Sequence, residues 1–127
     1  MRIATILALA LALGGCATTQ PTSPGLEKAV FEDIPAAEGM TYESGYGHKS
    51  RSGDLRTYTQ VYVGSRRLED VRRFYEEAMP VHKWVQVSAE GADPVTLTFD
   101  RRAERVVVTI GRSGTLLKVT VKVGGRN

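Results

Sequence analysis

Cysteine and histidine are scarce in this chain, and their scarcity excludes several kinds of site. Cys16 is the only cysteine among 127 residues, so no disulfide can form within one chain and no cysteine-rich metal site is possible. The two histidines, His48 and His82, fall in different predicted loops. A protein metal site usually takes three or more ligands at set spacings, and neither a His-X-His nor an HExxH pattern occurs. We therefore expect neither a bound metal nor a cofactor.

Recognisable arrangements of catalytic groups are missing as well. No Gly-X-Ser-X-Gly elbow occurs, and neither histidine has an evident serine and acid with which to complete a triad. Glu76 and Glu77 are adjacent on a predicted helix, where successive side chains point about 100° apart, so they are unsuited to paired acid–base work. The sequence thus predicts a protein that is not an enzyme and has no catalytic residues.

One loop contains residue types that bind phosphate, but not in the required order. Residues 44–54, SGYGHKSRSGD, combine glycine, lysine and serine without the GxxxxGK[ST] frame of a phosphate-binding loop. We interpret this stretch as a flexible hairpin loop. Lys49 and Arg51 of the loop, together with Arg56, are candidate contacts for an anionic partner.

The chain begins with an apolar run that is too short to span a membrane. Residues 3–13 are apolar except for Thr5. A helix of roughly eleven residues rises about 16 Å, whereas a bilayer core of about 30 Å needs roughly 20 apolar residues. Because Arg2 precedes the run and small residues follow it, the segment is typical of an export signal.

The end of this run resembles the lipobox of bacterial lipoproteins. The matching residues are Leu13-Gly14-Gly15-Cys16. The resemblance implies that residues 1–15 are a removed signal peptide and that Cys16 receives acyl chains on its thiol and its new amine. Ala17, where an aspartate would favour the inner membrane, implies the periplasmic face of the outer membrane, or the cell membrane where there is no outer membrane. Cleavage by an ordinary signal peptidase is the alternative.

The mature chain divides into a tether and one domain. Residues 16–25 hold Cys16 and a stretch of threonine, serine, proline and glycine that reads as a flexible linker. Nine extended residues reach at most about 30 Å, and two or more acyl chains give stable attachment, so the domain would stay near the membrane. Residues 26–127 have the size of one small domain with one core.

The hydrophobic periodicity predicts one helix and several strands. Residues 65–80 have helical spacing, with Ser65 as the N-cap and Pro80 as the stop. Alternating patterns predict strands at residues 57–63, 84–88, 95–100, 105–110 and 115–123, and residues 40–46 could add an edge strand. Residues 26–39 read as an irregular segment with at most one turn of helix. We therefore predict an α+β fold: a single antiparallel sheet of about four to six strands, in the order strand, helix, four strands, with the helix packed on one face.

A second resemblance concerns the helix and the strand after it. The sequence DVRRFYEEAMPVHKW is similar to a motif of uncharacterised bacterial lipoproteins and periplasmic domains, in which a Phe-Tyr pair precedes Met-Pro and then Gly-Trp. The matching residues are Val71, Phe74, Tyr75, Met79, Pro80 and Trp84. Lys83 replaces the usual glycine. The resemblance implies packing of a helix face and a tryptophan, and no chemistry.

Tyrosines and arginines supply the remaining candidate contacts. Tyr58 and Tyr62 share one face of a predicted strand, and if Val61 and Val63 face the helix, the tyrosines lie on the open face, where they could bind a partner. Packing between neighbouring strands is the alternative. The many arginines do not predict nucleic-acid binding, because an exported, tethered protein meets no nucleic acid.

These observations lead to three hypotheses. The first is a membrane-anchored envelope protein without catalytic activity that docks on a protein partner through the open sheet face or an edge strand. The second is a domain that binds a small ligand, a lipid or a cell-wall fragment, either between helix and sheet or in an arginine-lined groove. The third is a cell-wall hydrolase.

Overall fold

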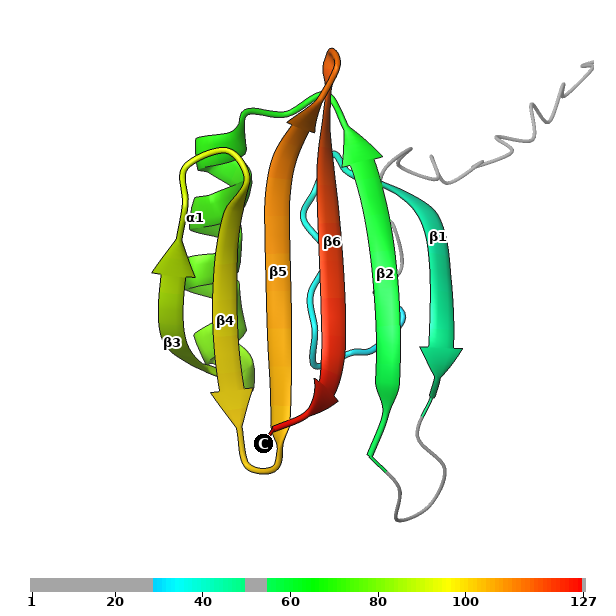
Figure 1. Cartoon of the computed structure of the whole chain (residues 1–127), viewed down its shortest axis with the longest axis vertical. Helices are drawn as coiled ribbons and strands as arrows, with labels where there is room; N and C mark the ends of the chain where they lie inside the picture. Colours follow the sequence, from blue (N-terminus) through cyan, green and yellow to red (C-terminus); the bar gives the residue numbers. More distant parts are fainter. Residues whose placement is uncertain (1–28, 50–54, 127) are drawn as a thin grey trace, which may run out of the picture.

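The computed structural model describes residues 29–49 and 55–126. These residues form one sheet of six strands with a helix on one side (Figure 1). In chain order the elements are β1 (Thr41–His48), β2 (Thr57–Gly64), α1 (Leu68–Ala78), the short 3₁₀ helix η1 (Met79–His82), β3 (Val85–Glu90), β4 (Val95–Arg101), β5 (Glu104–Ser113) and β6 (Leu116–Gly125). The predicted α+β class and its order are confirmed, and the possible edge strand is present as β1.

The strands are arranged in the order β1-β2-β6-β5-β4-β3, with antiparallel pairing throughout. The last strand, β6, therefore lies near the middle of the sheet and pairs with β2 on one side and β5 on the other. The helix connects β2 to β3, which are separated in the sheet by the three strands β6, β5 and β4. This connection carries α1 across one face of the sheet (Figure 1).

Large side chains from the four inner strands line up across the covered face. The register places Tyr58 beside Val123, Val123 beside Val106, and Val106 beside Phe99. All members of this row are buried. The alternation predicted for residues 95–100, 105–110 and 115–123 thus sets one apolar face, whose burial is the main stabilising contribution of the fold.

Two different segments cover this face. The helix lies behind β3, β4 and β5 and buries Leu68, Val71 and Tyr75 (Figure 1). Residues 29–40, which we call the cover segment, lie behind β6 and β2 on the same side and bury Ile34 and Met40 (Figure 1). The cover segment consists of turns, and the predicted turn of helix is not found in its described residues. The cover segment and α1 together form the second layer of the fold.

The ends of the helix differ from the prediction. Arg67, not Ser65, is the N-cap, and no side chain caps the first turn. Pro80 does not stop the chain from turning, because it occupies the first turn of η1, where a missing N–H is tolerated. The helical region ends instead at Lys83, whose φ of 71° is left-handed. Glycine adopts this conformation most easily, which explains the glycine that the similar motif has at this position.

The opposite face of the sheet is not covered by any described residue. Val61 and Val63 of β2 lie on this uncovered face, because Tyr58, Gln60 and Tyr62 alternate with them and point to the core. Each edge strand carries an irregularity, between Tyr42 and Ser44 in β1 and between Gln86 and Ser88 in β3. The sheet therefore has a broad open face and two interrupted edges.

Candidate functional site

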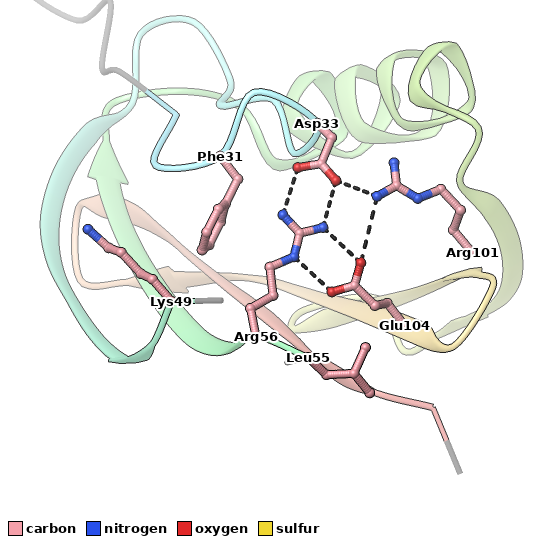
Figure 2. Close-up of a pocket in the computed structure, with 7 residues that line it drawn as sticks. All are labelled: Phe31, Asp33, Lys49, Leu55, Arg56, Arg101 and Glu104. Carbon is pink, nitrogen blue, oxygen red and sulfur yellow. Dashed lines mark hydrogen bonds and ion pairs between the residues drawn. The ribbon is translucent and has the colours of Figure 1, made fainter. Parts of the chain in front are cut away.

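A network of ion pairs closes the core at one end of the covered face. Arg56 precedes β2, and its guanidinium lies between two carboxylates (Figure 2). Its Nη1 and Nη2 donate to Oδ1 and Oδ2 of Asp33 at 2.8 and 2.6 Å. Its Nε and Nη2 donate to Oε2 and Oε1 of Glu104 at 2.8 and 3.0 Å. Such bidentate hydrogen bonds between charged groups are stronger than hydrogen bonds between neutral groups, and they also restrict the relative orientation of the two side chains.

Arg101 extends the network to the end of the helix. Its Nη2 donates to Asp33 and lies 3.7 Å from Oε1 of Glu104. Its Nη1 donates to the carbonyl of His82 at 2.9 Å, and the guanidinium lies 4.2 Å from the centre of the Trp84 ring. The indole Nε1 of Trp84 donates to the carbonyl of Asp33 at 2.8 Å. One cluster thus joins the cover segment, β2, the β4–β5 turn and η1.

The network changes the pKa values of Asp33 and Arg56. Hydrogen bonds from Arg56, and then from Arg101, lower the pKa of Asp33 to about 2 in spite of its partial burial. The bonds from Asp33 and Glu104 raise the pKa of Arg56. The pair of Asp33 and Arg56 therefore stays charged across the neutral range.

A cleft of about 460 Å³ opens beside the network (Figure 2). Its remaining lining residues are Phe31, Lys49 and Leu55. The guanidinium of Arg56 lies 4.7 Å from the centre of the Phe31 ring. The positive charges of Arg56 and Arg101 are balanced by the negative charges of Asp33 and Glu104. Lys49, the third cation of the cleft, makes no ion pair in the described part of the chain.

The structure brings together three of the five predicted contact residues. Lys49 is exposed and its Nζ lies 5.4 Å from the centre of the Tyr58 ring, and Arg56 lies in the same cleft. Arg56 is not a free cation, because its side chain is 9% exposed and is bound by two carboxylates. Arg51 and the lipobox cysteine, Cys16, lie outside the described residues.

The expectation that Tyr58 and Tyr62 lie on the open face is wrong. Tyr62 is 1% exposed and Tyr58 is 8% exposed, and both point to the covered face. The Phe31 ring meets Tyr58 edge-on at 5.7 Å, and the Tyr42 ring meets Tyr62 in the same way at 5.7 Å. The large rings fill the space beneath the cover segment, which the smaller valines of β2 would leave empty.

Polar atoms run through this aromatic region. The Tyr62 hydroxyl donates to Oε1 of the buried Gln60, and the Tyr42 and Tyr58 hydroxyls are 3.5 Å apart. The second of these contacts raises the pKa of Tyr42. Gly45 of β1 passes directly over the two hydroxyls, where a Cβ would lie 2.6 Å from the Tyr58 oxygen. Gln60 is in phase with the two tyrosines, and a polar residue at this position gives no indication in the sequence that this face is buried.

The uncovered face is built from small branched side chains and lysines. Lys118 and Lys122 of the inner strand β6 are exposed and make no ion pair in the described residues. Nearby, Asp100 accepts from Arg105 at 2.7 Å and lies 3.5 Å from Arg126, and the first of these contacts lowers the pKa of Asp100. The register places the two lysines among residues of the neighbouring strands, namely Thr59, Val61, Val63, Val107, Thr109 and Gly111.

A metal-binding group and a membrane-spanning helix are both absent from the described residues. No group of three histidine, cysteine, aspartate or glutamate side chains is placed to hold a metal ion within residues 29–49 and 55–126. None of the helices described is long and apolar enough to cross a membrane. Comparisons of the chain with protein-family models, curated proteins and solved structures found no match.

Proposed function

We propose that this chain is a lipid-anchored bacterial envelope protein whose domain docks on a protein partner without catalysing a reaction. The anchor rests on the resemblance of Leu13-Gly14-Gly15-Cys16 to a lipobox. The observation that carries the docking proposal is the face of the six-stranded sheet that no described residue covers. The opposite face already has two covers and a filled core, so it offers no room for a partner.

The open face, not an edge strand, is the docking surface that the geometry favours. A strand of a partner can extend a sheet only where the edge offers a regular row of backbone groups, and bulges are a common means of preventing this. Both edges here are irregular, β1 between Tyr42 and Ser44, and β3 between Gln86 and Ser88. Docking through the face needs no such regularity.

The chemistry of the open face indicates an acidic partner. Lys118 and Lys122 are cations on an inner strand without an ion pair in the part of the chain that the structure describes, while the carboxylate of Asp100 is shared by two arginines. The threonine and valine side chains around the lysines form a surface without long protruding groups. A partner surface that carries carboxylates among small apolar groups would complement both features.

Site-specific photocrosslinking in intact cells tests this proposal. A photoreactive amino acid at Thr120, between the two lysines on β6, is expected to form an adduct with a distinct envelope protein. The same amino acid at the exposed Glu77 of α1 is the matched control and is expected to form none. The double variant Lys118→Glu/Lys122→Glu should abolish the Thr120 adduct, whereas Arg67→Glu/Arg73→Glu on the helix side should not. Adducts from Glu77 alone, or none from Thr120, would contradict the proposal.

Binding of a small anionic ligand in the cleft beside Arg56 is the second candidate function. It is favoured by Lys49, which lines the cleft with Phe31 and makes no ion pair in the described residues, and by a volume of about 460 Å³, within the range of ligand pockets. Calorimetric titration with lipids and cell-wall fragments tests it. Binding that disappears in high salt and in Lys49→Glu would support recognition by charge, and no binding in low salt would exclude this function for the fragments used.

A further inference from the structure

Exposed apolar side chains gather near the start of β3. Val81 of η1 is 73% exposed, and Val85 and Val87 of β3 are 64% and 50% exposed. They are half of the six large exposed hydrophobic residues described, and they lie within seven positions of one another. A cluster of this kind, unlike a scattered exposed residue, indicates contact with another surface.

Cationic side chains lie beside the two valines of β3. A second cleft, of about 480 Å³, is lined by Val85 and Val87 together with Lys83, Arg101, Arg102 and Arg126. Its one acidic residue, Asp100, is bound by Arg105 and Arg126. Lys83 and Arg102 make no ion pair in the described residues, so their charges are available to a ligand. We call Val81, Lys83, Val85, Val87, Arg102 and Arg126 the β3 corner.

The two free cations of the β3 corner are held in a costly backbone conformation. Lys83 has a φ of 71° and Arg102 a φ of 54°, and they are the two non-glycine residues with positive φ in the described chain. For a residue with a side chain this conformation costs about 1 kcal/mol, which glycine would avoid. Strain of this kind tends to gather where a side chain is needed for binding.

The cover segment contacts a residue that lines the second cleft. The chain enters the described structure at residue 29, and Asp33 binds Arg101, which lines both clefts. Asp33 of the cover segment is therefore joined to one wall of the second cleft through Arg101. An anchor ahead of residue 29 would hold the domain, and this cleft with it, within reach of a lipid surface.

We infer that the β3 corner rests on an anionic lipid surface. Phosphate groups of the lipid would bind Lys83 and Arg102, and the three valines would enter the boundary between headgroups and acyl chains. The inference deepens the proposed function and rests on it for the anchor. It concerns the β3 edge of the sheet, whereas docking of the protein partner concerns the part of the open face around Lys118 and Lys122 of β6.

Vesicle sedimentation tests this inference without the anchor. The mature chain, residues 16–127, carrying Cys16→Ala is mixed with vesicles of phosphatidylcholine, with or without phosphatidylglycerol. Tighter binding to the anionic vesicles, weakened by salt, is expected. Because each basic residue near such a surface contributes about 1 kcal/mol, the variant Lys83→Glu/Arg102→Glu should lower the affinity by about tenfold or more. The variant Val81→Ser/Val85→Ser should weaken the binding that remains in high salt.

The control reverses the same number of charges on the open face. Lys118→Glu/Lys122→Glu is expected to change vesicle affinity far less, and thermal unfolding of each variant establishes that it is folded. Equal affinity of the parent chain and Lys83→Glu/Arg102→Glu would overturn the inference, and so would full competition by soluble glycerol phosphate, which would indicate a site for small anions. Photocrosslinking from Thr120 in cells is independent of this result, so failure of the lipid contact leaves the docking proposal to its own test.

Discussion

The carboxylate of Asp33 and the guanidinium of Arg56 face each other in a two-pronged ion pair, with N–O distances of 2.8 and 2.6 Å. Asp33 belongs to the cover segment and Arg56 to the start of β2. On its other side Arg56 binds Glu104, and Arg101 binds Asp33. The pair therefore joins the cover segment, which contains no strand, to the start of β2.

Loss of Arg56 should be the most destabilising change among the ion pairs. Arg56→Ala is expected to lower the free energy of unfolding by about 3 kcal/mol, because it leaves two carboxylates close together without their shared cation. Urea denaturation measures the change. Arg73→Ala is the control, since its side chain is 67% exposed and lies 3.9 Å from Asp70, so it should cost less than about 0.5 kcal/mol. Similar losses in the two variants would contradict this role for Arg56.

The low pKa of Asp33 predicts acid sensitivity. The carboxyl group has a pKa of about 2 in the folded chain against 3.8 without its partners. Its ionised form therefore adds stability that is complete above about pH 4 and is lost as the pH falls toward 2. With allowance for solvent screening, the contribution is about 1 to 2 kcal/mol.

Urea denaturation at a series of acidic pH values checks this dependence. Asp33→Asn should be less stable than the parent chain at neutral pH, and the difference should shrink as the pH falls. Asp100 also has a lowered pKa, so some acid sensitivity is expected to remain in the variant. A constant difference between the two proteins at every pH would show that the charge of Asp33 is not responsible.

Replacement of Lys83 by glycine should give a more stable protein than replacement by alanine. Its φ of 71° favours glycine, so Lys83→Gly is expected to be about 1 kcal/mol more stable than Lys83→Ala, which keeps the strain and loses the charge. Thermal unfolding of the two variants measures this difference. If Lys83 contacts lipid as inferred, Lys83→Gly should at the same time bind anionic vesicles less tightly.

Gly45 should not tolerate a side chain. A Cβ at this position would lie 2.6 Å from the Tyr58 hydroxyl, inside van der Waals contact, so Gly45→Ala is expected to cost about 1 to 3 kcal/mol by displacing the packed tyrosines. Gly124→Ala is the matched control, because nothing lies within 4 Å of the Cβ that it would add. Chemical denaturation of both variants distinguishes a steric effect from a general effect of glycine replacement.

The alternation of residues 95–123 was sufficient to predict the class of the fold and the inner faces of β4, β5 and β6. The facing of β2 could not be predicted in the same way, because both of its faces carry branched or aromatic side chains. The side that faces the core is decided by where α1 and the cover segment pack, and neither position is encoded within the strand.

The ion-pair network could not be predicted from the sequence, for a related reason. Arg56 was predicted as a free contact because its partners lie 23 and 48 positions away, and Asp33 lies 68 positions from Arg101. No spacing rule links residues so distant. Arg51 and Cys16 stay predictions, and so do the anchor and the compartment.

The cover segment also decides where the domain can be shortened for expression. A boundary placed at the first regular strand would begin with Thr41 and would remove Phe31, Asp33 and Ile34. Tyr58 and Tyr62 would then face water and Arg56 would lose a carboxylate, so the shortened product should be prone to aggregation even though every helix and strand is intact. A recombinant fragment that is meant to behave like the parent protein has to start ahead of residue 29.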